Sequence, residues 1–219
     1  PSFDDGTLLR VNVPLGSRPS AIFKGPLSYP CGVAIAPDGS FALVGSHEDG
    51  QVVKISLPEP DELARYSGFE ETMKMAIAPN GNWALVTNWT GSVSRLDLES
   101  GTVTTLCGGL QNAWGVAIAP DSSFALVGHN GSLAHLALGD EGRLAELTWP
   151  TWGAELRGAM GISISRDGRT ALISRGGHGE PGGSEVMLVD LQRGFVSTAK
   201  DGFGAPSGVA YSPDNATFL

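Results

Sequence analysis

Cysteine, lysine and long apolar runs are all scarce in this chain. The two cysteines, Cys31 and Cys107, are too few for a disulfide framework or a four-cysteine zinc site. No apolar run reaches the roughly 18 residues that a membrane-spanning helix needs, so no direct membrane span is predicted. Only four lysines accompany a net charge of −9. Because such a surface repels phosphate backbones, we expect no nucleic-acid partner.

Short catalytic motifs are missing as well. The chain contains no G-x-S-x-G, H-E-x-x-H or C-x-x-C sequence. GHGEPG (177–182) has the form G-x-G-x-x-G, but EVMLVDL follows it, and not the helix that dinucleotide binding requires. We interpret it as a glycine-rich hairpin loop. No catalytic residue is predicted, and we lean towards a protein without enzymatic activity.

What the chain does have is turns and a repeat. It contains 31 Gly and 14 Pro in 219 residues, with 41% hydrophobic residues to fill a core. GVAIAPDGSFALVG (32–45) returns as GVAIAPDSSFALVG (115–128), with thirteen of fourteen letters identical, and weaker copies occupy 74–87, 161–174 and 208–219. The copies are spaced by 41 to 47 residues. A period of about 20–50 residues indicates a solenoid, a propeller or an array.

Each repeat has the pattern of four short strands. GVAIAP, an Asp-Gly or Asn-Gly hairpin and FALV are followed by a run of period-two alternation such as SVSRLDL (92–98) and by a weaker fourth run such as GTVTTL (101–106). Four strands in about 42 residues is the size of one propeller blade. We therefore predict an all-β, single-domain β-propeller spanning 1–219, with four blades at about 30–69, 72–108, 113–150 and 159–201.

The two ends are predicted to complete a fifth blade. DDGTLLRVNV (4–13) fits the columns of a third strand, and the chain stops at Leu219 within a second strand. Residues 206–219 plus 1–27 would then form one blade, in which N- and C-terminal strands pair and close the ring. Closure removes exposed sheet edges. The alternative, a piece of a longer propeller, stays open.

The repeat resembles those of a known group of propellers. GVAIAPDGSFALVG, followed in the next repeat by GSVSRLDLESGTVTTLCGG (91–109), is similar to the NHL-repeat and YVTN-type β-propellers, and LVTN (85–88) is close to the motif that names the second group. The copy at 161–174 departs from the pattern, since Arg166 replaces the hairpin proline. Propellers of this kind serve as protein-interaction platforms, RNA-binding modules, sensor ectodomains, amidating lyases and lactonase-like hydrolases. The resemblance therefore implies a fold and selects no function.

Binding residues are expected on the loop face that surrounds the mouth of the central channel. The loop at 176–184 is longer than its counterparts and carries His178 and Glu180. Insertions in repeat proteins often map to a binding face. Tryptophans in segments on this face are further candidates for a protein contact, with packing between blades as the alternative. They are Trp89, Trp114, Trp149 and Trp152.

Three histidines in the loops between second and third strands are candidate metal ligands. His47, His129 and His178 belong to three different blades and circle one axis, so they could converge on a divalent metal ion. Solvated loop histidines are the simpler interpretation. The residues expected to ring the start of the innermost strands offer no Glu, Asp or Asn, which argues against a metal-dependent hydrolase. By alignment they are Cys31, Lys74, Trp114, Met160 and Ser207.

The leading hypothesis is a non-enzymatic NHL-like propeller without a cofactor that acts as a protein-interaction or scaffold module, alone or within a larger assembly. Protein partners would bind its loop face. The alternative is a channel-mouth metal-dependent hydrolase or lyase, or a small-ligand-binding propeller. A soluble protein is expected and its compartment is left open, because sequons at Asn88, Asn130 and Asn215 also admit a secreted or organellar location.

Overall fold

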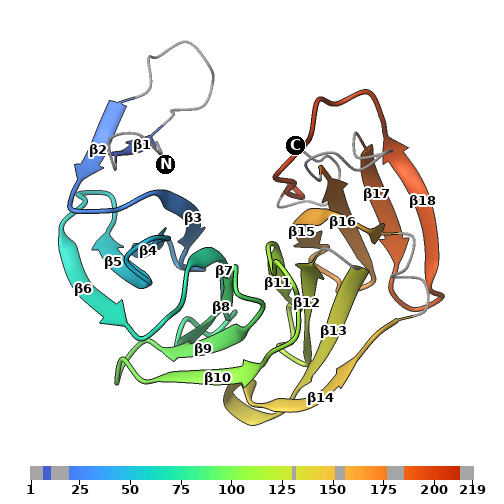
Figure 1. The fold of residues 1–219 in the computed structure, drawn as a ribbon, viewed down its shortest axis with the longest axis horizontal. Coiled ribbons are helices and arrows are strands. Elements are labelled where there is room, and N and C mark those ends of the chain that lie inside the picture. Colours follow the sequence, from blue (N-terminus) through green and yellow to red (C-terminus); the bar gives the residue numbers. More distant parts are fainter. Residues whose placement is uncertain (1–6, 11–19, 130–131, 151–155, 177–184, 213–219) are drawn as a thin grey trace.

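The structure is a computed structural model that describes residues 7–10, 20–129, 132–150, 156–176 and 185–212. Four antiparallel sheets of four strands each are arranged around a common centre (Figure 1). Within each sheet the strands follow one another in chain order, and the first strand lies innermost (Figure 1). The predicted β-propeller is confirmed.

We name the four sheets blades I to IV. Blade I contains β3 (Pro30–Ile35), β4 (Phe41–Ser46), β5 (Gln51–Ser56) and β6 (Glu62–Ser67). Blade II contains β7 (Thr72–Ile77), β8 (Trp83–Asn88), β9 (Val93–Asp97) and β10 (Val103–Cys107). Blade III contains β11 (Val116–Ile118), β12 (Phe124–His129), β13 (Ser132–Leu138) and β14 (Leu144–Thr148), with a single 3-10 turn, η1 (Asp140–Gly142), before β14. Blade IV contains β15 (Ala159–Ile164), β16 (Thr170–Arg175), β17 (Glu185–Asp190) and β18 (Phe195–Lys200).

Among the described residues, the predicted number of five four-stranded blades is corrected to four. The fifth sheet has two strands, β1 (Thr7–Arg10) and β2 (Ser20–Lys24), which pair with each other. At the other end of the chain, residues near Tyr211 run beside β15, where the Tyr211 amide donates to Ser163 Oγ at 3.1 Å. No strand of the described residues joins these two ends, and the rest of the predicted terminal pairing, 1–6 and 213–219, lies outside them.

Apolar side chains between neighbouring sheets form the core. The second strands are buried on both faces, which explains their near-continuous apolar sequence, and the leucine at the middle of each is at most 1% exposed. These leucines are Leu43, Leu85, Leu126 and Leu172. Separate clusters join blade I to II, II to III and III to IV. Since burial of apolar area drives folding, each blade is stabilised by its neighbours.

The Asp-Gly and Asn-Gly hairpins close as the sequence predicts. Asp38 Oδ1 accepts from the Ser40 amide at 3.0 Å, and Gly39 between them has φ +72°. The copy in blade III keeps the same turn with Ser122 at φ +61°, in the left-handed region that favours glycine. The turn is therefore held by the aspartate side chain as well as by the glycine.

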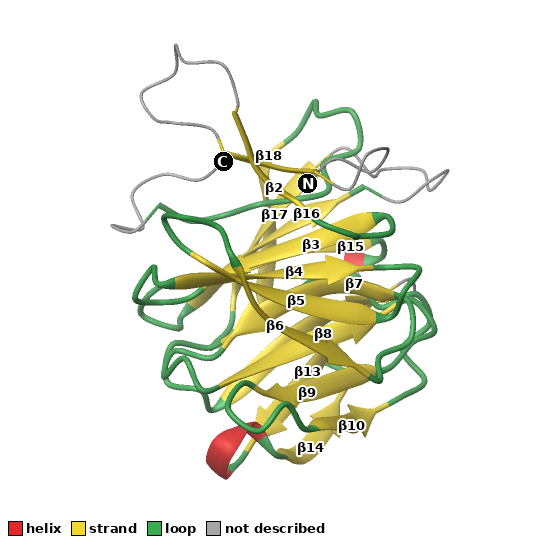
Figure 2. Cartoon of the chain, turned by 90° about the vertical axis from the view of Figure 1, so that its left-hand side faces the viewer, coloured by secondary structure: helices red, strands yellow, loops and turns green. Residues whose placement is uncertain are grey.

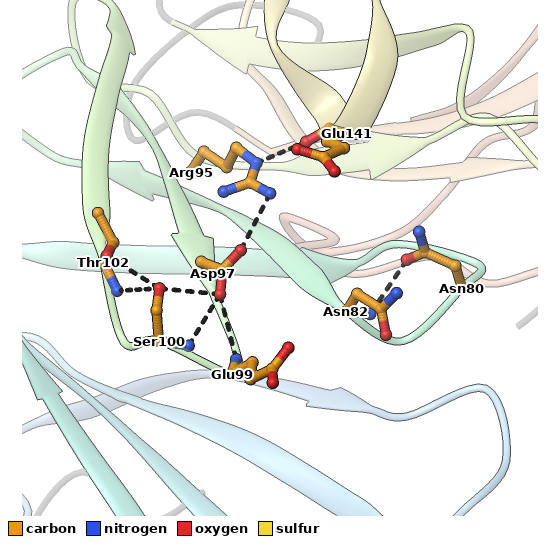
Figure 3. A network of polar contacts seen from close by, with 8 residues as sticks. All are labelled: Asn80, Asn82, Arg95, Asp97, Glu99, Ser100, Thr102 and Glu141. Carbon is orange, nitrogen blue, oxygen red and sulfur yellow. Dashed lines mark hydrogen bonds and ion pairs between the residues drawn. The ribbon is translucent and has the colours of Figure 1, made fainter.

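Polar contacts tie blade II to blade III on the outer side (Figure 3). Arg95 Nε donates to the Glu141 carbonyl oxygen at 2.6 Å, and its Nη2 forms an ion pair with Asp97 Oδ2 at 3.3 Å. The backbone amide and hydroxyl of Ser100 both donate to Asp97, which lowers the pKa of its carboxyl group. Figure 2 shows the propeller from the side, with the twisted sheet of blade I towards the viewer and η1 beside β14. No helix of the described residues is long and apolar enough to cross a membrane.

Candidate functional site

The mouth of the central channel holds a hollow of about 480 Å³, which we call the mouth hollow. It is formed by the starts of first strands, by loops between second and third strands, and by the segment after β18. Its lining residues are Tyr29, Cys31, His47, Met73, Lys74, Trp89, Trp114, Met160, Gly176, Ala205 and Ser207. A smaller hollow of about 180 Å³ is lined by Lys74, Met160 and Ser207 together with residues further along the inner strands. These three residues therefore lie at the neck between the two hollows.

Strand register gives Lys74 a place that glycine fills in the other repeats. Met75 on β7 and Val33 on β3 are equivalent, because each pairs with the corresponding valine of its second strand. Lys74 precedes Met75 just as Gly32 precedes Val33. The remaining copies have Gly115, Gly161 and Gly208 at this position.

This register corrects the ring expected from sequence. The expected ring has Lys74 beside Cys31 and Trp114, but the blade II member of that ring is Met73. Lys74 belongs to the next layer down the channel. The repeat alignment of 74–87 with 32–45 already carries this information, since it sets Lys74 on Gly32.

Three glycines of this layer, Gly32, Gly115 and Gly161, are required by the close approach of neighbouring backbone. A Cβ added to Gly32 would lie 2.6 Å from the Met73 carbonyl oxygen, and one on Gly115 would lie 2.6 Å from that of Met160. On Gly161 it would lie 2.8 Å from Gly208 Cα. Contacts under about 3 Å cannot be relieved by side-chain rotation when the neighbour is backbone. Lys74 is thus the one long side chain in a layer otherwise made of glycine.

Lys74 carries a partly buried positive charge. Its Nζ donates to the Cys31 carbonyl oxygen of blade I at 3.2 Å. No ion pair joins it to an Asp or Glu of the described residues. Burial lowers the pKa of the Lys74 ammonium, an effect that the nearby Cys31 opposes. A desolvated ammonium with one hydrogen-bond acceptor is a site that favours an incoming anion.

Two tryptophans form one wall of the mouth hollow. Trp89 and Trp114 meet edge to face, with ring centroids 5.3 Å apart and planes at 84°. The buried Thr87 side chain positions this wall, since its Oγ1 donates to the Trp114 carbonyl oxygen at 2.5 Å. Thr87 Oγ1 also accepts from the Lys74 amide at 3.1 Å. One hydroxyl group therefore holds the backbone of both the tryptophan wall and the lysine.

Tyr29 and His47 form a second wall. Their ring centroids are 5.7 Å apart. Tyr29 has φ +53°, a left-handed conformation that is rare for a bulky residue, and its side chain is 47% exposed. His47 Nδ1 lies 3.1 Å from the Thr72 carbonyl oxygen, to which it donates a hydrogen bond. Strained backbone that presents an aromatic ring to solvent is typical of binding sites.

The titratable side chains of the described lining are those of Tyr29, Cys31, His47 and Lys74. None of the lining residues that the structure describes is an Asp or Glu. Burial raises the pKa of the Cys31 thiol, so it is largely the un-ionised, weakly nucleophilic form at neutral pH. The hollow thus combines aromatic and thioether walls with one ammonium group.

The structure brings together part of the residue set predicted from sequence. His47, Trp89 and Trp114 line the mouth hollow. His129 and Trp149 instead pair with each other, edge to face at 5.3 Å, and Trp149 is 52% exposed. Trp152, His178 and Glu180 lie outside the described residues.

The metal hypothesis on His47, His129 and His178 stays a prediction. Among the described residues no three His, Cys, Asp or Glu side chains are grouped as metal ligands would be. His129 is 8% exposed, and burial lowers its pKa. Sequence reasoning missed two features of the mouth hollow. It did not place Lys74 in the glycine layer, and it did not single out Tyr29, which forms the second wall with His47.

Comparison with known proteins identifies the fold. As many as 1532 chains of solved structures match, so the architecture is widespread and selects no activity. Hydrazine synthase from Kuenenia stuttgartiensis matches with a TM-score of 0.72 and 20% identity over 91% of this chain and 57% of that chain. A functionally unknown protein from Desulfotomaculum acetoxidans matches with a TM-score of 0.67 and 19% identity over 96% of this chain and 67% of that one.

These likenesses show that the chain is a β-propeller protein and do not extend to its activity. It spans little more than half the length of the hydrazine synthase chain. No protein-family model and no curated protein sequence matches it.

Proposed function

We propose that the protein is a non-catalytic NHL- or YVTN-like β-propeller that binds a partner protein through the loop face around the mouth hollow. The repeat GVAIAPDGSFALVG and the tetrapeptide LVTN (85–88) support the NHL- or YVTN-like character. In this role the packed blades supply a rigid frame, and the loops that differ between repeats supply recognition.

The observation that carries the proposal is the gathering of aromatic side chains at one hollow. Tyr29, His47, Trp89 and Trp114 come from three blades and surround the same space. Tyrosine and tryptophan in pockets dominate the energy of protein interfaces, because they bury large areas at low entropic cost. The absence of a carboxylate from the described lining favours this role over a metal-dependent hydrolase or lyase.

Paired variants test the proposal. The mouth variant combines Tyr29→Ala with Trp89→Ala. The control combines Leu63→Ala with Phe195→Ala, two side chains that are 55% and 65% exposed on the outer strands β6 and β18. Circular dichroism and thermal unfolding first establish that both variants are folded.

The readout is cross-linking of the tagged protein in its native extract, followed by quantitative mass spectrometry and by titration of the purified partner. We expect the same partner to bind the wild type and the control variant, with about 10-fold or greater loss for the mouth variant. Equal binding to all three proteins, or no reproducible partner of the wild type, would overturn the proposal.

A further inference from the structure

We propose that the Lys74 ammonium anchors a carboxylate whose aromatic or branched aliphatic body occupies the mouth hollow. The proposal rests on the proposed function in using the mouth hollow as a binding site. It adds the chemical class of the ligand and the residue that selects it. The carboxylate can belong to a free organic acid or to the C-terminus of a partner protein.

The position of Lys74 is the first argument. In the layer of Gly32, Gly115, Gly161 and Gly208, Lys74 alone extends a long side chain, and it lines both channel hollows. At Gly32, Gly115 and Gly161 the neighbouring backbone approaches so closely that no side chain fits, whereas Gly208 has open space around it. The only charge of this layer therefore lies at a single point of the ring.

The unfilled bonding capacity of Lys74 is the second argument. An ammonium group has three donors, and within the described residues one of them is used, towards the Cys31 carbonyl oxygen at 3.2 Å. A carboxylate oxygen would accept a second hydrogen bond and neutralise the charge. Charge-assisted bonds of this kind are about twice as strong as those between neutral groups.

The charge of the lining selects a monoanion. Lys74 is the only Lys or Arg among the described lining residues. Phosphate and diphosphate groups are usually bound by several cations or by rows of backbone amides. A carboxylate requires one cation, which is what this hollow provides.

The walls select an apolar body. Trp89 and Trp114 offer an edge and a face, and Met73 and Met160 offer polarisable thioethers that adapt to rings and branched chains. The volume of about 480 Å³ lies within the roughly 300–1,000 Å³ of small-ligand sites. A small acid or the last residue of a peptide fits such a space.

Calorimetric titration with matched probes tests the inference. The free-acid arm compares phenylacetate with phenylacetamide and isocaproate with isocaproamide. The peptide arm compares tripeptides ending in Phe or Leu as the free carboxylate or as the C-terminal amide. Each amide keeps the shape of its acid and removes the charge.

The protein variants are Lys74→Met, which keeps the length of the side chain without its charge, and Lys54→Met as control. Lys54 lies on β5, with its Nζ 4.2 Å from the centre of the Phe41 ring and away from the mouth hollow. For the wild type and Lys54→Met we expect at least one acid to bind about 10-fold to 100-fold more tightly than its amide. In Lys74→Met this preference should vanish. Carboxylate binding should also fall as the pH rises through the Lys74 pKa, because the neutral amine no longer pairs with it.

The outcomes separate the sources and the two proposals. Binding of the peptide acids without the free acids identifies a partner's C-terminus, and the reverse identifies a small molecule. No preference for any acid in the wild type, or an undiminished preference in Lys74→Met, overturns the carboxylate inference. If Lys74→Met abolishes acid binding while the mouth variant keeps its protein partner, the interaction proposal fails and the carboxylate inference stands.

Discussion

Replacing Thr87 by valine should weaken the propeller and displace one wall of the mouth hollow. The Thr87 side chain is fully buried. Its Oγ1 accepts from the Lys74 amide at 3.1 Å and donates to the Trp114 carbonyl oxygen at 2.5 Å, with the Lys74 carbonyl oxygen at 3.1 Å as a second acceptor. Valine has nearly the same shape and can make none of these bonds.

The expected loss follows from the groups left without partners. One amide and one carbonyl lose their hydrogen bonds, at about 2 kcal/mol each. Burial of a methyl group in place of the hydroxyl returns about 1 kcal/mol. We therefore expect Thr87→Val to lower the free energy of unfolding by about 3 kcal/mol, which for a domain of this size lowers Tm by about 6–12 °C.

Urea unfolding, followed by circular dichroism, measures the change. Thr87→Ser is the matched control, since it keeps the hydroxyl group and should lose only about 1 kcal/mol for the missing methyl group. A Thr87→Val protein as stable as the wild type, or a serine variant weaker than the valine variant, would refute the assigned role of the hydroxyl group.

Further predictions concern the core, the glycine layer and the lysine. The Trp83 side chain is 2% exposed, so Trp83→Ala should lower the free energy of unfolding, measured with urea, by about 3–5 kcal/mol. The Phe195 side chain is 65% exposed, so Phe195→Ala should change it by less than about 0.5 kcal/mol. Equal effects would contradict the core assignment. Gly115→Ala places a methyl group 2.6 Å from a carbonyl oxygen of the next blade and should cost about 1–3 kcal/mol, while Gly108→Ala, with nothing within 4 Å, should leave Tm nearly unchanged; an unaffected Gly115→Ala would argue against close approach. Lys74→Met should be more stable than the wild type at neutral pH, because burial lowers the lysine pKa in the folded state. The stability advantage of Lys74→Met should shrink as pH rises from the lowered folded-state pKa towards the ordinary lysine pKa of 10.5, because in this range the unfolded wild type binds more protons than the folded one. A stability advantage that grows with pH would refute the burial of this charge.

Much of the fold is predictable from the sequence because it depends on local pattern. The Asp-Gly hairpin after Pro37 and the alternation in β9 are set by neighbouring residues, and both form as expected. The hairpin turn also forms in the copy without the glycine, since Ser122 adopts the backbone conformation of the glycine it replaces. The number of complete blades was mispredicted because it depends on pairing between distant ends of the chain, which no local pattern determines.

The candidate site was only partly predictable for a related reason. His47, Trp89 and Trp114, which the sequence predicts on the loop face, line the mouth hollow, and their role in binding stays a prediction. The layer of Lys74 was misjudged by one residue, and a shift of one residue in a strand moves a side chain to the opposite face. Tyr29 gave no signal in the sequence, because its exposure results from a backbone conformation that only the packing of blade I determines.

Lys74 also removes a rotational ambiguity from the propeller. A ring of similar repeats presents nearly the same surface at every step around its axis, so a ligand lying on the axis would have several equivalent poses. Gly32, Gly115 and Gly161 preserve that equivalence, and a single ammonium group beside them ends it. A ligand that needs this charge is bound in one rotational orientation about the propeller axis. The rest of its surface then faces a defined set of loops. Lys74 thus fixes the orientation of such a ligand about the axis of the quasi-symmetric propeller.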